Sequence, residues 1–464
     1  MPDLRSSEDA LRQTLRTIEP HAAFVEAVGQ TASGTQLRID RSGAEVGVEP
    51  ILDGAAIRAW AGDHWVEVAS SGFERAALTA AADSLISQLR HASSHAPPPG
   101  ASATGSRDAV HPPRHSVAEM SVDDRLALVR RWRETALAVD GIKEASGVLY
   151  SQIDARLYVN TVGGRRYQEV ERTLAAIAPV AIEAGRVEYD ALQRGGVGGQ
   201  ELLTAVDDEA VRACAASAVA LLKSKAPPAG PMTVVLNPSV TGTLAHESFG
   251  HGTEADQFVR DRSYLKPILG SRVGPDFLSI VDDGSLPGGW GSIYFDDEGT
   301  PSRPNYLIQN GQFVGVLHDR VSASLLGGTP TGNARRSDFL SRQWVRMTNT
   351  YVQPGDWTRE EVIEEARDGV LLERFTSGIE DPLGGLMQIK VRKGRRIEHG
   401  RETELYSSMA LSGRVLDVLG SVRAISKVDS LVMDTGFCGK GHGDYIPAGS
   451  GGAYLLTQAV VGPA

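Results

Sequence analysis

The sequence predicts an α/β domain in its first half and a mostly antiparallel β domain in its second half. A chain of 464 residues is too long for one ordinary hydrophobic core. Its first half mixes helical and alternating patterns, whereas short strand patterns with turn signals dominate the rest. The run "KAPPAGP" at 225–231 lies between the two kinds of sequence pattern. We therefore expect domains at 1–228 and 229–464.

The first half is expected to begin with a helix, several strands and a second helix. "TQLRIDRSGAEVGVE" and "AAIRAWAGDHWVEVA" alternate apolar and polar residues, whereas "ERAALTAAADSLISQL" has the helical period. Residues 91–114 are rich in Pro, Ser, Gly and Ala, which indicates a flexible excursion or linker. "SVDDRLALVRRWRETALAV" predicts a helix opened by a capping Ser or Asp. Strands around a turn and a helix near 199–224 should follow.

The second half is expected to start with a strand in "MTVVLNPSV" and a helix in the histidine-containing stretch after it. Many short strands follow. Asn310 and Gly311, between "YLIQ" and "QFVGVL", predict a tight β-hairpin. Two later helices, near 358–368 and 412–423, should interrupt the antiparallel strands.

Composition narrows the function classes. The net charge of −11 argues against nucleic-acid binding. No apolar run reaches the length of a membrane span, and the N-terminal residues lack the apolar centre of a signal peptide, so we expect a cytoplasmic protein. Of the two cysteines, Cys214 lies in an alanine-rich helix and should be a core residue. Cys438 lies in what reads as a glycine-rich loop, where packing gives no reason for a cysteine.

The stretch "TLAHESFGHGTEAD" (243–256) almost matches the zinc-protease pattern. In that pattern the second histidine is four positions after the first, whereas His251 is five positions after His246. In an ideal α-helix this spacing places the two side chains about 140° apart. A π-bulge would bring them to one face, since it adds a residue to a turn and favours functional sites. Alternatively, Gly250 could end or distort the helix. The alternative without a metal site is a helix start whose polar side chains are solvated.

These residues permit a zinc site. A catalytic zinc takes three nitrogen, sulfur or oxygen ligands and keeps one position open. His246 and His251 could supply two of them and Cys438 the third, as a thiolate, with glycines around it that let the backbone approach the ion. Glu247, beside the first histidine, could act as the general base.

Five ordered motifs resemble the TldD/PmbA family: "HESFGHGTEAD", "VDDGSLPGGWGSIYFDDEGTPSRPNYLIQNGQFVGVLHDR", "TPTGNARRSDF", "RMTNTYVQPG" and "CGKGHGDYIPAGSGG". The similarity covers residues 232–457 strongly and the first half only in layout. It implies an α/β domain followed by a β domain, and a homodimer or heterodimer with a TldD/PmbA-type subunit. It also implies Zn²⁺ held by His246, His251 and Cys438, with Glu247 as catalytic base, as in the active subunits.

The resemblance implies a hydrolase that cleaves extended peptides or peptide-like substrates. An alternative is a member recruited to secondary metabolism that cleaves a C–N or C–S bond in a peptide-derived conjugate, by elimination if Glu247 removes a substrate proton. A third alternative is a non-catalytic partner or regulatory subunit, since the family has been linked to modulation of DNA gyrase.

Two departures from the family pattern bear on the substrate. Ala255 replaces the usual glycine, and His442 stands where the pattern has none, so His442 could contact substrate. Arg335 and Arg336 could grip a substrate carboxylate or hold their loop through an ion pair. His318 lies in an alternating strand and could contact substrate or form a cross-strand hydrogen bond. The acidic residues Asp296, Asp297 and Glu298 are expected to be solvated turn carboxylates.

Overall fold

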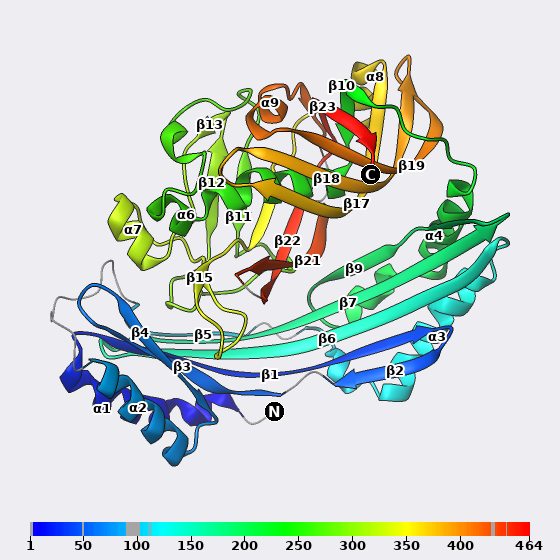
Figure 1. Cartoon of the computed structure of the whole chain (residues 1–464). Coiled ribbons are helices and arrows are strands. Elements are labelled where there is room, and N and C mark those ends of the chain that lie inside the picture. The colour runs from blue at the N-terminus through cyan, green and yellow to red at the C-terminus, as the bar shows by residue number, and fades with distance from the viewer. Residues whose placement is uncertain (1–2, 49–50, 90–102, 111–112, 428–431, 442) are drawn as a thin grey trace.

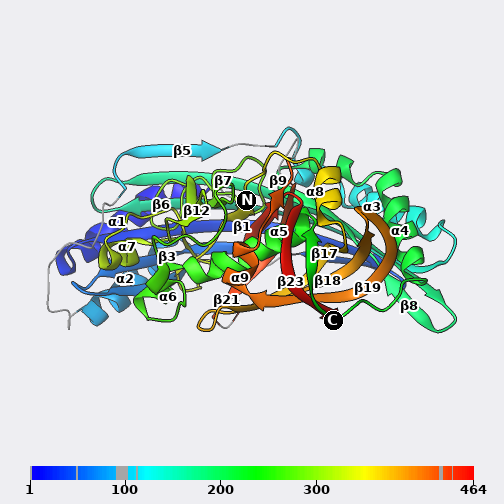
Figure 2. The same ribbon diagram turned by 90° about the horizontal axis from the view of Figure 1, so that it is seen from above.

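The computed structural model describes residues 3–48, 51–89, 103–110, 113–427, 432–441 and 443–464. A long curved sheet built from the first half lies beneath a β-rich second half, as Figure 1 shows. Figure 2, seen from above, shows the second half lying along this sheet. The predicted fold class, α/β followed by mostly antiparallel β, is confirmed.

The sheet of the first half has nine strands within the described residues. Its main order is β4-β3-β1-β6-β7-β5, with β2 paired to β1 and both β8 and β9 paired to β7; all neighbours are antiparallel except β5 and β7. The strands are β1 (Val25–Asp40), β2 (Gly43–Val48), β3 (Leu52–Trp60), β4 (Trp65–Ser71), β5 (Ser106–Val110), β6 (Ile142–Asn160), β7 (Arg165–Glu183), β8 (Arg186–Tyr189) and β9 (Leu192–Val197). Strands β6 and β7 form the predicted hairpin.

Four helices and several short 3₁₀ turns accompany this sheet. The helices are α1 (Glu8–Ile18), α2 (Arg75–Leu89), α3 (Val122–Leu137) and α4 (Asp208–Leu221). The short turns are η1 (Leu4–Ser7), η2 (Glu19–His21), η3 (Val117–Glu119) and η4 (Gln200–Ala205). Helices α1 and α2 share one apolar cluster with the sheet, and α3 and α4 share another, which includes Cys214. Ser121 caps α3 by accepting a hydrogen bond from the Asp124 amide, as the sequence predicts.

The segment expected to be a flexible excursion contains strand β5, which the sequence analysis did not predict. Strand β5 pairs with β7 from Ser106 opposite Arg165 to Val110 opposite Glu169. Residues 91–102 and 111–112 of this segment lie outside the described residues. A parallel neighbour far along the chain supplies the pairing, which composition alone does not reveal.

The second half contains two larger sheets and one small one. Strand β10 is hydrogen-bonded to both β17 and β23, so the first sheet closes into a ring of β10, β17, β18, β19 and β23. Strand β20 pairs with β23. The strands of this sheet are β10 (Gly230–Leu236), β17 (Gly369–Asp381), β18 (Leu386–Glu398), β19 (Arg401–Arg414), β20 (Ala424–Ile425) and β23 (Leu455–Pro463). The second sheet, ordered β13-β12-β11-β16-β22-β21, has β11 (Ile280–Asp283), β12 (Pro304–Gln309), β13 (Gln312–Phe313), β16 (Asn349–Val352), β21 (Val432–Lys440) and β22 (Asp444–Gly452). Strands β14 (Ala334–Arg335) and β15 (Trp344–Val345) form the small one.

Short helices connect these strands. They are α5 (Pro238–Thr243), α6 (Ala255–Val259), α7 (Arg320–Leu326), α8 (Arg359–Ala366) and α9 (Val415–Gly420), with a 3₁₀ turn η7 (Lys266–Ile268). Helices α8 and α9 match the two that the sequence predicts. Asn310 and Gly311 both have positive φ, 51° and 76°, and join β12 to β13 in the predicted hairpin. Among the described residues, no helix is long and apolar enough to cross a membrane.

A cluster of buried charges joins the two halves. The Arg320 guanidinium at the start of α7 donates to both carboxylate oxygens of Glu26 on β1, at 2.5 and 2.6 Å. Arg58 on β3 pairs with Glu26 and with Glu298, the latter at 2.7 Å. All four side chains are buried, and the Tyr158 hydroxyl also donates to Glu26 at 2.6 Å. The charges of two buried guanidinium groups therefore balance those of two buried carboxylates.

The expectation that Asp296, Asp297 and Glu298 are solvated is wrong, because all three are buried. Asp296 accepts hydrogen bonds from the amides of Glu298, Thr300 and Ala334. Asp297 pairs with Arg156 of β6 at 2.7 Å. The acidic turn is thus the contact point for arginines of the first half, whose position the sequence does not reveal.

We predict that Arg320→Met lowers the free energy of unfolding by about 3–5 kcal/mol, because it leaves two buried carboxylates to share Arg58. The control is Arg396→Met, which removes an exposed pair with Glu398 of 2.7 Å and should cost less than about 1 kcal/mol. Urea unfolding of both variants measures the difference. Equal losses would show that the cluster is not what joins the halves.

Candidate metal centre

The histidine stretch forms a π-turn. Helix α5 runs directly into η5 (Leu244–Gly250), which has π geometry, and a 3₁₀ turn η6 (His251–Thr253) follows. The His251 amide donates to the His246 carbonyl, five residues back. This wider turn brings residues five apart to the same side. Of the two predicted explanations for the spacing, the structure has the π-turn.

Gly250 does not end the helix, because its φ and ψ of −60° and −61° are helical. It is required for a different reason. A Cβ atom at this position would lie 2.0 Å from the Met347 sulfur. The glycine therefore lets the π-turn pack closely against the core of the second half.

Three donor atoms converge at this turn. His246 Nε2 lies 3.3 Å from the Cys438 sulfur, and His251 Nε2 lies 3.2 Å from it. The two imidazole rings are almost perpendicular, at 86°. A tetrahedral zinc with Zn–N near 2.1 Å and Zn–S near 2.3 Å would separate N and S by about 3.6 Å. The donor types and their spacing therefore fit a zinc ion.

Cys438 is on a strand, not in the glycine-rich loop that the sequence suggests. It lies on β21, opposite Ile446 of β22. Arg346 fixes the backbone by donating to the Cys438 carbonyl at 2.5 Å. Burial alone would raise the pKa of the Cys438 thiol, but the imidazoles of His251 and His246 lower it well below its ordinary value. The thiol is therefore poised to ionise, as a metal ligand must.

Glu247 lies beside these donors in a cavity of about 530 Å³. Backbone segments of two strands border this metal cavity, Gly378–Glu380 of β17 and Gly436–Lys440 of β21. A Cβ atom at Gly378 would lie 2.5 Å from Cγ of Glu247. Only glycine at this point of β17 leaves room for the carboxylate.

A second carboxylate contacts the outer ring nitrogen of His251. Glu254 is buried, and its Oε2 lies 3.4 Å from Nδ1 of His251. Lys440 donates to the same oxygen at 2.9 Å and to Asp256 at 2.8 Å. Burial would raise the pKa of Glu254, but Lys440 and His251 lower it. A carboxylate on the outer imidazole nitrogen orients a histidine for metal binding. The role of Glu254 is not apparent from the sequence motif, although its spacing of three residues from His251 is a signal.

Glu380 is another wall residue that the sequence analysis missed. Both of its carboxyl oxygens are buried and have no hydrogen-bond partner among the described residues. Burial raises the pKa of Glu380 to about 8. At neutral pH this carboxyl group is therefore mostly protonated. Nothing in the local sequence "SGIED" distinguishes it from a solvated strand residue.

The remaining predicted substrate residues occupy different places. Arg335 and Arg336 line a second cavity beside the metal cavity. His318 lines neither; it is buried, with Nδ1 3.2 Å from the Ser322 hydroxyl. Ala255 is fully buried at the start of α6 and also lines neither. His442 lies outside the described residues.

Comparisons with known proteins find similarity to metallopeptidases. A family model described as the PmbA/TldA metallopeptidase C-terminal domain matches residues 229–456. A metalloprotease of Methanocaldococcus jannaschii is 35% identical over 315 residues, covering 68% of this chain and 69% of the relative. A zinc metalloprotease TldD homolog of Saccharolobus solfataricus is 33% identical over 238 residues, covering 51% and 52%.

Two solved structures share the fold over almost the whole chain. A Thermotoga maritima protein proposed as a modulator of DNA gyrase has a TM-score of 0.81 at 18% identity, covering 98% of this chain and 99% of that one. TldE of Thermococcus kodakarensis has a TM-score of 0.78 at 16% identity, covering 98% and 100%. At these identities the likeness concerns the fold alone.

We predict that Cys438→Ser lowers the bound zinc from one ion per chain to well below half, because a serine hydroxyl is a much weaker zinc ligand than a thiolate. Cys214→Ser is the matched control, since Cys214 is buried in the core of the first half. Elemental analysis after dialysis measures both. Full zinc in Cys438→Ser would remove this residue from the ligand set.

We also predict a pH effect at His318, where burial lowers the pKa to about 4. Between about pH 6.5 and 4 the unfolded chain binds a proton that the folded chain does not, so stability falls as pH falls. The loss should be on the order of 2 kcal/mol and should shrink in His318→Gln. Urea midpoints at pH 7 and 4.5, in chelator-treated protein, measure it, with the exposed His21→Gln as control. An unchanged pH dependence in His318→Gln would contradict the assignment.

Proposed function

Since this chain belongs to the TldD/PmbA family of metallopeptidases, we propose that it is a zinc-dependent hydrolase of extended peptides or peptide-like substrates. The observation that carries the proposal is the convergence of His246, His251 and Cys438 beside Glu247 in one cavity. That set combines a three-ligand zinc site with a carboxylate that touches the space where water and substrate would meet.

Each residue then has a separate task. Zinc at this site would supply Lewis acidity, which activates water and polarises a carbonyl group. Glu247 accepts the proton of the attacking water and passes it to the leaving amine. Glu254 holds the His251 ring in place, and Lys440 keeps Glu254 ionised. Glu380 lines the same cavity as a further carboxyl group, whose pKa burial raises.

The strands around the metal cavity favour an extended substrate. Strand β21 is the last strand of its sheet, so one of its edges carries no sheet neighbour within the described residues. The end of β17 faces it across the cavity. A peptide in extended conformation can add to such an edge through main-chain hydrogen bonds.

We further propose that the working form is a dimer with a TldD/PmbA-type subunit, either a second copy or a related chain. The fold shared with TldE supports a partner of the same architecture. Native mass spectrometry of the co-expressed proteins would report the mass of two chains. A single-chain mass for the active protein would contradict this part of the proposal.

We predict that Glu247→Gln lowers peptide turnover by at least about 10²-fold while zinc content stays unchanged, because the amide cannot accept the proton. Turnover is measured by mass spectrometry of a peptide library and a cell extract, with Glu365→Gln on the exposed face of α8 as control. Chelation should abolish turnover in the wild type.

Three results would change the assignment. Undiminished turnover in Glu247→Gln would exclude this carboxylate as the base. Products without the added mass of one water would indicate elimination instead of hydrolysis. A function that survives both Glu247→Gln and chelation would favour the role of a non-catalytic partner subunit.

A further inference from the structure

A second cavity, of about 460 Å³, adjoins the metal cavity. Phe437 and Tyr445, from the β21–β22 hairpin, line both. The wall of the second cavity that faces the hairpin is formed by β6 and β7 of the first half, and residues 335–338 complete it. The two cavities are therefore neighbours on either side of this hairpin.

Two arginines in this cavity have carboxylate partners. Arg156 on β6 lies 2.7 Å from Asp297 and 3.3 Å from Asp154. Arg336 lies 2.7 Å from Glu67 of β4. Their charges are offset within the protein, so neither is available to an incoming anion. Arg336 thus forms ion pairs of the kind that the sequence offers as one of its two alternatives.

Two other arginines in the same cavity are held differently. Arg172 on β7 donates to the carbonyls of Trp290 and Ser292, at 2.8 and 2.9 Å. Arg335 on β14 donates to the carbonyls of Met347 and Pro447, at 2.5 and 2.9 Å. These contacts fix both guanidinium groups but bring no negative charge. In the described part of the chain, no carboxylate lies within ion-pair distance of either one.

The nearest acids are already engaged. Asp154 accepts hydrogen bonds from Gln30 and Arg156. Asp282, whose charge acts on Arg335, accepts hydrogen bonds from Asn333, Thr348 and Thr350, and burial raises its pKa. Four arginines and four aspartates line this cavity, so its total charge is close to balanced. The aspartates nevertheless form their bonds with other groups, and Arg172 and Arg335 are left without an ion-pair partner among the described residues.

Both guanidinium groups are strongly buried, with 3% of Arg172 and 5% of Arg335 exposed. A buried cation without a counter-ion is costly, and the pKa values reflect that cost. Burial lowers the pKa of Arg172 to about 10. Burial and the charge of Arg172 lower the pKa of Arg335 to about 9. An anion between them would relieve this cost.

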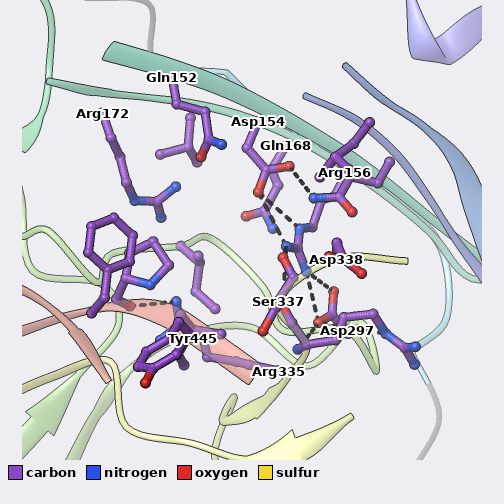
Figure 3. A pocket seen from close by; sticks show the side chains of 18 of the residues that line it. Gln152, Asp154, Arg156, Gln168, Arg172, Asp297, Arg335, Ser337, Asp338 and Tyr445 are labelled. Atoms are coloured by element: carbon purple, nitrogen blue, oxygen red, sulfur yellow. Dashed lines mark hydrogen bonds and ion pairs between the residues drawn. The ribbon is translucent and has the colours of Figure 1, made fainter. Parts of the chain in front are cut away.

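Figure 3 shows Arg172 reaching into the cavity from β7 and Arg335 on the opposite wall beside Tyr445. Gln152 on β6 lies next to Arg172, and its side-chain amide makes no hydrogen bond to the described residues. Three donor groups in this cavity therefore make no hydrogen bond to the described residues: Arg172 Nη1, Arg335 Nε and the Gln152 amide. Donors of this kind in one cavity, two of them charged, suit a carboxylate.

We propose that the second cavity is an anion-binding subsite, in which Arg172 and Arg335, aided by Gln152, hold a carboxylate of the substrate while the bond to be cleaved lies in the metal cavity. The proposal rests on the proposed peptide hydrolase function for the identity of the ligand. The carboxylate is either the C-terminus of a peptide or an acidic side chain, because both present the same two oxygens.

The test measures binding in the absence of cleavage. All proteins carry Glu247→Gln and are loaded with zinc, and affinities are measured by isothermal titration calorimetry. One peptide pair is acetyl-Ala-Ala-Ala with a free C-terminus and its C-terminal amide. The other pair is acetyl-Ala-Glu-Ala-amide and acetyl-Ala-Gln-Ala-amide. The first pair tests the C-terminus and the second the side chain as source of the carboxylate.

We expect the charged peptide of at least one pair to bind about tenfold or more tightly than its neutral match. Arg172→Gln should bring this ratio close to one. Gln152→Glu should do the same without removing a buried guanidinium, because it places a carboxylate beside Arg172. Arg303→Gln is the control and should leave the ratio unchanged, since Arg303 also donates to a backbone carbonyl, that of Pro330, but is exposed.

The outcomes are distinguishable from those for the proposed function. No preference for the charged peptide in either pair, including no binding at all, overturns the subsite. A preference that persists in both Arg172→Gln and Gln152→Glu also overturns it. If the ratio behaves as expected but the zinc-loaded wild type cleaves no peptide, the subsite stands and the hydrolase assignment fails.

Discussion

The buried ion cluster of Glu26, Arg58, Glu298 and Arg320 is the interaction on which the arrangement of this protein depends. It joins β1 and β3 of the first half to the acidic turn and helix α7 of the second. Four charges removed from water are stable only when each keeps its partners, so the cluster allows the two halves one relative position. The second cavity lies between these halves, and its shape follows from that position.

The metal centre depends on a more local constraint. A regular α-helix would point His246 and His251 in different directions, and only the π-turn lets both reach Cys438. The turn is itself supported from outside, because Gly250 must pack against Met347 and Gly378 must leave space for Glu247. Glycines from two distant segments thus serve one site. Their function here is close packing, whereas a positive φ explains the glycine of the β12–β13 hairpin.

The arginines that line the second cavity show how one residue type takes different roles according to its neighbours. Arg156 and Arg336 meet carboxylates and act as ion-pair partners between the halves. Arg172 and Arg335 meet only carbonyl oxygens, which orient a guanidinium group without offsetting its charge. Adjacent positions, 335 and 336, fall into different groups because Glu67 of β4 lies beside Arg336, whereas only carbonyl oxygens contact Arg335.

The sequence by itself determined the family, the fold class, most helices and the Asn310–Gly311 hairpin, because these depend on local periodicity, turn chemistry and motif spacing. It also singled out the four residues that the structure brings together in one cavity, His246, Glu247, His251 and Cys438. It left the π-turn and a distortion at Gly250 as alternatives. Only the tertiary structure decided between them. The same holds for strand β5, the buried state of Asp296–Glu298, the support of His251 by Glu254 and the different partners of Arg335 and Arg336. Each of these depends on which residue of a distant segment lies opposite, and burial and charge balance are properties of such contacts, not of a residue's neighbours along the chain.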